Sequence, residues 1–159
     1  MEILIYGRHT IEKVARKPFN APTAVISIAD VGDDFAMLEN TPKYLHCVSF
    51  DDVDNDVIVD ELGSNGTAEQ ILAIEKKYKM FSTEQATEIA RFYFSVSDKV
   101  DCIICQCEHG QSRSAAVAAA IIEFQSKNGI SVFADDNYYP NKVVFRRILS
   151  ALREYSSTI

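Results

Sequence analysis

Short apolar runs alternate along this chain with longer segments in which apolar residues recur at helical spacing. Runs rich in Val, Ile and other apolar residues predict strands at 2–6, 24–29, 43–49 and 100–106. Helical periodicity and helix-start signals predict helices at 10–16, 33–38, 67–78, 82–96, 113–125 and 141–155. Because strands and helices alternate, the 159 residues are predicted to form a single α/β domain over 1–159, with a central, mostly parallel sheet of about four to five strands flanked by helices.

The connection between the strand at 100–106 and the helix at 113–125 carries the strongest chemical signal. It reads Cys-Glu-His-Gly-Gln-Ser-Arg over residues 107–113. A short loop between a strand and a helix can turn its backbone N–H groups inward as an anion nest, with the positive end of the helix dipole behind it. Gly110 has no Cβ, so the loop can turn tightly or adopt a positive φ at this position. Arg113 can donate two parallel hydrogen bonds to an oxyanion. The pattern therefore predicts a phosphate-binding loop.

The first and last positions of this pattern predict nucleophilic chemistry. A helix N-terminus and a nearby guanidinium both favour the thiolate form of a cysteine, so Cys107 is a candidate nucleophile at neutral pH. Ser114 follows the arginine directly and can donate a hydrogen bond to the sulfur. Such a bond would help the sulfur to leave when a covalent intermediate breaks down.

The motif Cys107-x-x-Gly110-x-x-Arg113-Ser114 resembles the signature of the cysteine-dependent protein tyrosine phosphatase superfamily, in particular its small dual-specificity-like members of bacterial or phage type. The resemblance implies phosphomonoester hydrolysis through a cysteinyl-phosphate on Cys107, with no metal ion and no other cofactor. It departs at Gln106, where the family usually has a histidine that contributes to the surroundings of the thiolate. It also implies a phosphate-binding loop made of Cys107, Glu108, His109, Gly110, Gln111, Ser112 and Arg113.

The same resemblance implies a general acid on a loop upstream of the nucleophile. An acidic run at 50–56 follows the predicted strand at 43–49, and parallel strands bring their carboxyl ends to one edge of a sheet. Its placement favours Asp52 as the proton donor, with Asp51 second and Asp54 third. The alternative is a solvated acidic loop without a catalytic role.

Composition and cysteine usage restrict the class of protein. The formal net charge of −7 argues against binding to nucleic acid or to an anionic membrane surface, and no signal peptide or membrane-spanning run is visible. Cys102 and Cys105 fall on opposite faces of one predicted strand, and no second ligand pair accompanies them, so we expect core residues and not a metal site. Cysteines used in this way indicate a reducing, cytoplasmic location. A disulfide from Cys47 or Cys105 to Cys107 under oxidation is a further hypothesis.

The sequence favours a protein-tyrosine or dual-specificity phosphatase that acts on a phosphorylated protein or a small phosphomonoester. The variable loop positions Glu108, His109, Gln111 and Ser112 include no lysine, which argues against highly anionic substrates such as inositol phosphates. Two alternatives stay open: a phospho-binding pseudophosphatase on the same fold, and sulfur transfer or arsenate reduction at a cysteine-containing anion loop.

Overall fold

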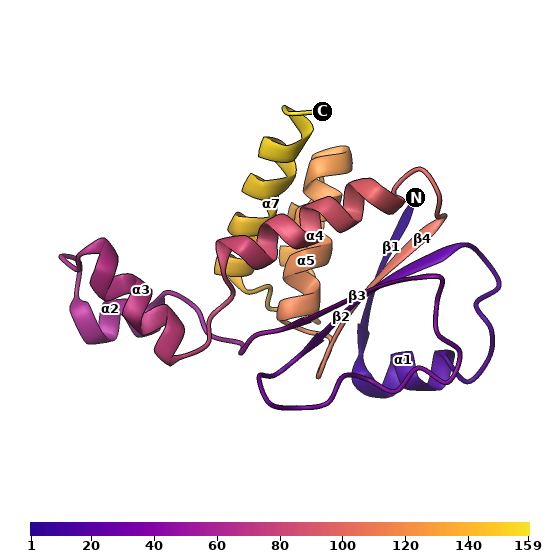
Figure 1. Cartoon of the computed structure of the whole chain (residues 1–159), viewed down its shortest axis with the longest axis horizontal. Coiled ribbons are helices and arrows are strands. Elements are labelled where there is room, and N and C mark those ends of the chain that lie inside the picture. Colours follow the sequence, from indigo (N-terminus) through magenta and orange to yellow (C-terminus); the bar gives the residue numbers. More distant parts are fainter.

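The computed structural model describes residues 1–159 and contains four strands and seven helices. In chain order these are β1 (Glu2–Gly7), α1 (Arg8–Val14), β2 (Thr23–Ala29), β3 (Tyr44–Ser49), α2 (Asp56–Leu62), α3 (Ala68–Lys77), α4 (Thr83–Val96), β4 (Cys102–Cys107), α5 (Arg113–Ser126), α6 (Ile130–Phe133) and α7 (Lys142–Ser156) (Figure 1). The strands form one parallel sheet in the order β1-β4-β2-β3. The predicted α/β class with a parallel sheet flanked by helices is confirmed.

The central strand, β4, is buried along its whole length between β1 and β2. Its last residue, Cys107, pairs with Gly7 of β1, while Gln106 pairs with Ser27 of β2. Because all four strands are parallel, their carboxyl ends lie at the same edge of the sheet. The loops that follow them therefore come together there, as expected for a ligand site in a parallel sheet.

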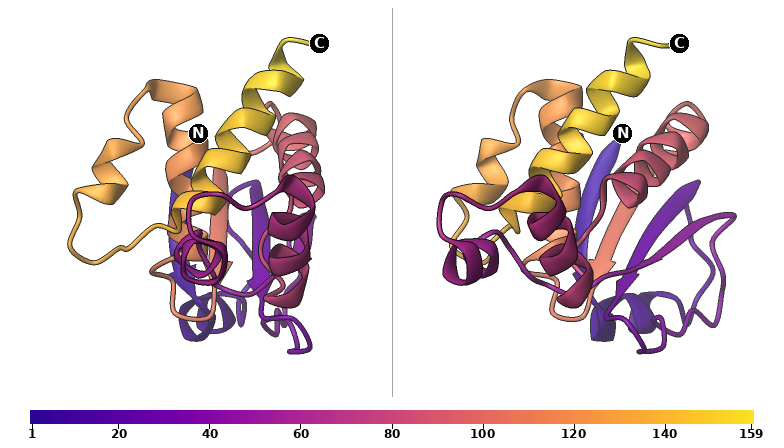
Figure 2. Two further views of the ribbon diagram at one scale, coloured as in Figure 1. Left: turned by 90° about the vertical axis from the view of Figure 1, so that its left-hand side faces the viewer. Right: turned by 60° about the vertical axis from the view of Figure 1, so that its left-hand side comes forward.

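Helices α4 and α5 cover one face of the sheet, α7 packs against both of them, and α1 lies on the other face (Figures 1 and 2). The main core of 25 buried residues fills the first interface, and a smaller cluster around Ile11 fills the second. Cys105 belongs to the main core and Cys102 to the smaller cluster, which confirms that they point to opposite faces of β4. No helix combines the length and apolar character that a bilayer crossing requires.

Helix α5 is rich in alanine and sits deep in the molecule. All residues from Arg113 to Ile121 are buried, on every side of the helix. Small side chains let the helix approach both the sheet and α7 closely. This packing holds the N-terminus of α5 at the end of β4, where the sequence predicts the phosphate loop.

Two of the expectations for helices need comment. The helix predicted at 82–96 is confirmed as α4, which begins with a capping box formed by Ser82 and Gln85. The short helix predicted at 33–38 is wrong, because the segment is irregular and satisfies its backbone groups on α1 instead of within itself. Asp34 O accepts from Arg8 Nη2 (2.6 Å), and Met37 N donates to Glu12 Oε1 (3.0 Å).

Helices α2 and α6 were not predicted. Helix α2 is short, has no buried residue, and lies with α3 outside the layers of the sheet and its helices (Figure 1). Its apolar residues Val57, Ile58 and Leu62 are only half-buried, and a helix of seven residues is too short to show a sustained helical period in the sequence.

The close approach of Gly110 to β1 gives a first prediction. Gly110 has φ 72°, and a Cβ there would lie 2.5 Å from Gly7 N and 2.7 Å from Tyr6 C, which are backbone atoms. We expect Gly110→Ala to lower the free energy of unfolding by about 2–4 kcal/mol, from left-handed strain together with displacement of the loop. The control Gly32→Ala also has positive φ (91°) but nothing within 4 Å, and should lose only about 1 kcal/mol. Urea unfolding measures both; equal losses would show that the approach to β1 does not hold the loop.

Candidate active site

The loop at 108–112 connects β4 to α5 and uses its carbonyl groups, not its N–H groups, to bind the rest of the protein. Glu108 O accepts from Arg8 N (3.0 Å), Gln111 O from Tyr139 N (2.8 Å) and Ser112 O from Asn141 N (3.4 Å). None of the backbone N–H groups of residues 108–113 donates a hydrogen bond within the protein. A row of free backbone donors in front of a helix N-terminus is the arrangement that binds an oxyanion.

Cys107 lies at the base of this loop, at the end of β4. Its side chain is buried, and its Sγ is 3.1 Å from the Oγ of the fully buried Ser114. The structure thus brings together the predicted nucleophile and the predicted donor to its sulfur. A hydroxyl at this distance can stabilise a thiolate by donating to it.

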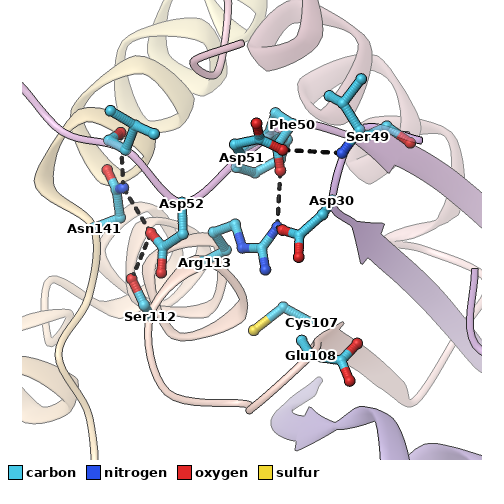
Figure 3. Close-up of polar contacts among 12 residues, drawn as sticks. Asp30, Ser49, Phe50, Asp51, Asp52, Cys107, Glu108, Ser112, Arg113 and Asn141 are labelled. Carbon is cyan, nitrogen blue, oxygen red and sulfur yellow. Dashed lines mark hydrogen bonds and ion pairs between the residues drawn. The ribbon is translucent and has the colours of Figure 1, made fainter. Parts of the chain in front are cut away.

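Arg113 is the first residue of α5 and is 4% exposed. Its Nη1 donates to Asp30 Oδ1 (2.5 Å) and to Phe50 O (2.8 Å) (Figure 3). Its Nε is buried and has no partner. One side of the guanidinium is therefore held by the ends of β2 and β3, and Nε remains to donate to a ligand.

The sequence analysis did not identify Asp30. It follows directly on the apolar run at 24–29, and such a residue is normally taken for the start of a turn. Only the parallel pairing of β2 with β4 places it beside Arg113, and no local pattern carries that information.

Gln106, at the position where the resemblance leads one to expect histidine, is fully buried and has a defined set of partners. Its Oε1 accepts from Ser27 Oγ (2.7 Å), and its Nε2 donates to Cys107 O (2.8 Å). The amide thus connects β2 to the backbone of Cys107. Ser27 is the one polar residue in an otherwise apolar run, and that is the signal by which it could have been found.

The acidic run after β3 reaches the phosphate loop through Asp52. Its Oδ1 accepts from Ser112 Oγ and from Asn141 Nδ2, both at 2.9 Å, and its Oδ2 has no protein partner (Figure 3). Asn141 Nδ2 also donates to Val53 O (3.1 Å). The carboxyl of Asp52 is therefore fixed at one oxygen and free at the other, at the rim of the loop.

The other two acid candidates are used within their own segments. Asp51 Oδ1 accepts from Val31 N (3.0 Å), which joins the acidic run to the loop after β2. Asp54 Oδ1 accepts from Asp56 N (2.9 Å) at the start of α2. Of the three carboxyls, only that of Asp52 hydrogen-bonds to the phosphate loop.

The side chain of Glu108 points toward α1. Its Oε2 accepts from Arg8 Nε (2.6 Å), and this hydrogen bond raises the pKa of Arg8. Only the backbone N–H of Glu108 therefore remains for the predicted phosphate binding. The side chains of His109 and Gln111 are exposed.

All four cysteines are free. Burial raises the pKa of the Cys105 thiol, which keeps this thiol neutral and unreactive. A disulfide between Cys107 and another cysteine stays a prediction.

Comparison with known proteins finds solved structures with a similar fold. No family model matches the sequence, and no curated protein matches it. Among solved structures, PTPMT1 in complex with PI(5)P is 12% identical with a TM-score of 0.51, and covers 99% of this chain and 94% of its own. Tk-PTP in its active form is 16% identical with a TM-score of 0.50, over 97% of this chain and 92% of its own. The chain has the fold of the small cysteine-dependent protein tyrosine phosphatases.

The two neighbours are matched over nearly their whole length. The single domain over 1–159 stays a prediction. The likeness concerns the fold, and activity has to be argued from the site.

The buried amide of Gln106 gives a second prediction. Gln106→Ala leaves Ser27 Oγ and Cys107 O without partners and opens a cavity, so we expect a loss of about 2–4 kcal/mol of stability. Ser27→Ala should cost about 1–2 kcal/mol. The control Gln125→Ala removes the amide of an exposed residue that donates to Tyr93 OH (3.2 Å) and should cost about 0.5 kcal/mol. Urea unfolding of the three variants checks this, and a Gln106 variant as stable as the Gln125 variant would contradict it.

Proposed function

We propose that this protein is a phosphomonoester hydrolase of the protein-tyrosine or dual-specificity type, working through a cysteinyl-phosphate on Cys107. The observation that carries the proposal is the buried guanidinium of Arg113 with an unpartnered Nε, beside a loop whose backbone N–H groups are free. A buried cationic donor without an acceptor is costly. A phosphate dianion supplies the missing acceptors and matches the planar guanidinium.

In the first step the thiolate of Cys107 attacks phosphorus. A P–S bond forms, and the bond from phosphorus to the leaving oxygen breaks. The loop N–H groups and Arg113 bind the three non-bridging oxygens, on which the negative charge is spread in the transition state. Asp52, in its protonated form, gives its proton to the leaving oxygen from the free Oδ2.

In the second step water attacks the phosphocysteine. Asp52, now a carboxylate, accepts a proton from the water, the P–S bond breaks, and inorganic phosphate is released. Sulfur leaves as a thiolate. The hydroxyl of Ser114, 3.1 Å from Sγ, donates a hydrogen bond that stabilises this leaving group.

Several neighbours act by positioning the reacting groups. Asp30 holds Nη1 of Arg113, so that Nε and Nη2 face the substrate. Ser112 and Asn141 hold Oδ1 of Asp52, which leaves Oδ2 for proton transfer. Gln106 fixes the carbonyl of Cys107 at the start of the loop.

The loop favours phosphoprotein-like monoesters over highly charged phosphates. None of its side chains other than Arg113 and the exposed His109 is basic, and the side chain of Glu108 is already paired with Arg8. The site therefore has one fixed cation and the loop N–H groups for one phosphate group.

The third prediction tests the activity itself. Wild-type protein should hydrolyse p-nitrophenyl phosphate, and Cys107→Ser should abolish turnover while still binding inorganic phosphate in a calorimetric titration. The reason is that serine removes the thiolate but leaves the loop N–H groups and Arg113 in place. Phosphate binding by the wild type without turnover would indicate a pseudophosphatase, and turnover that survives Cys107→Ser would contradict the proposed nucleophile.

The fourth prediction tests Asp52. Asp52→Asn should lower kcat for phenyl phosphate by about 10²–10³-fold, because phenolate leaves poorly without a proton. The loss for p-nitrophenyl phosphate should be about tenfold smaller in the first step, since nitrophenolate is a good leaving group.

Asp51→Asn and Asp54→Asn are matched controls, because asparagine keeps the oxygen that each uses as an acceptor. We expect them to stay within about threefold of wild type. If Asp51→Asn or Asp54→Asn lowered kcat much more for phenyl phosphate than for p-nitrophenyl phosphate, that residue and not Asp52 would be the general acid.

A further inference from the structure

A cavity of about 850 Å³ opens beside the phosphate loop, on the side of Asp52. Ser112 of the loop lines it, and the acidic run with Asp52 and the start of α2 form one wall. The opposite wall is the segment that leads into α7 together with the first two turns of that helix, including Tyr139, Lys142 and Arg146. The cavity therefore begins where the leaving group of a bound phosphomonoester departs.

The wall formed by α7 is fixed to the phosphate loop. Tyr139 N donates to Gln111 O (2.8 Å), and Asn141 N donates to Ser112 O (3.4 Å). Asn141 also caps α7 through its Oδ1, which accepts from the N–H groups of Val143 and Val144. Side chains on the first turns of α7 are thus held at a set position relative to the loop.

Lys142 and Arg146 are the cations on this wall. They lie four residues apart on α7, line the same cavity, are exposed, and form no ion pair. Lys142 is the first residue of α7, where the helix dipole disfavours a positive charge, and the first turn has no acidic residue. The adjacent Arg147 shows the contrast, because it is bound to Glu75 and to Phe81 O. Lys142 and Arg146 have no such structural partner.

The cavity also has acidic groups, Asp52, Asp54 and Asp56, on the acidic run and at the start of α2. Asp52 accepts from Ser112 and Asn141, and Asp54 accepts from Asp56 N, but none of the three carboxylates forms an ion pair with Lys142 or Arg146. The two cations on the wall formed by α7 are therefore not paired across the cavity, and an acidic side chain placed against α7 would meet both of them.

We propose that this cavity is a substrate subsite in which Lys142 and Arg146 bind an acidic side chain close to the phosphorylated residue of a phosphopeptide. The inference rests on the proposed function. Each extended residue spans about 3.3–3.6 Å, so a glutamate one or two positions from the phosphorylated residue reaches a cavity that starts at the rim of the loop. The volume is within the range of about 300–1,000 Å³ typical of ligand pockets and has room for such a side chain.

The fifth prediction tests this subsite with two phosphotyrosine peptides that are identical except for glutamate or lysine at the positions flanking the phosphotyrosine. Wild-type kcat/KM should favour the glutamate peptide by about 3- to 30-fold, the range expected for two partly exposed ion pairs. Lys142→Glu and Arg146→Glu should each reduce this ratio, and the double variant should reverse it. The ratio is taken within one protein sample, so it does not depend on the fraction folded or on the rate of the chemical step.

Arg153→Glu is the matched control, because it reverses an exposed, unpaired cation at the far end of the same helix. It should keep the wild-type ratio. A wild-type ratio near one, or a preference for glutamate that survives in the double variant, would overturn the subsite.

Affinities of the same peptides for Cys107→Ser, measured by calorimetry, separate this proposal from the proposed function. A glutamate preference in binding without wild-type turnover would support the subsite and contradict the hydrolase. Hydrolysis of both peptides at equal kcat/KM would support the hydrolase and contradict the subsite. Failure of both peptides to bind would contradict both proposals.

Discussion

A guanidinium cation is buried at the first residue of α5, at the end of the helix where the dipole disfavours a positive charge. Arg113 tolerates this position because Asp30 and the carbonyl of Phe50 accept from its Nη1. These two partners lie at the ends of β2 and β3, so the same contact joins both strand ends to the phosphate loop. The Nε of the guanidinium has no protein acceptor, and in the proposed function the phosphate supplies one.

The rest of the site follows from this contact. Asp52 comes two residues after Phe50, so the carbonyl that binds Arg113 also holds the acidic run near the loop. On the opposite side Gly110 lies against β1, with no room for a Cβ between them. The loop is thus fixed between β1 and the acidic run, and the N–H groups that the proposed function assigns to phosphate binding are held in place by these contacts.

Local patterns in the sequence were sufficient for the parts of the site that are continuous in the chain. The strand, loop and helix around Cys107 were predicted because an apolar run, a glycine, an arginine and an alanine-rich segment follow one another. The partners that come from other strands were not predicted. Ser27 stands out as the one polar residue of its apolar run, but its contact with Gln106, like the contact of Asp30 with Arg113, depends on the pairing of β2 with β4. The helix wrongly expected at 33–38 is a further case in which contacts between distant segments decide the structure. The backbone of this segment binds side chains of α1, and no local sequence pattern indicates that contact.

The central claim is that phosphorus becomes bound to the sulfur of Cys107. Its most direct test is mass spectrometry of the Asp52→Asn variant, quenched in denaturant during turnover of p-nitrophenyl phosphate. This substrate needs little acid catalysis in the first step, while loss of the base slows hydrolysis of the intermediate, so the adduct accumulates. The account predicts one added phosphoryl group, located on the peptide that contains Cys107. A phosphoryl group on any other residue, or turnover with no covalent adduct, would contradict it.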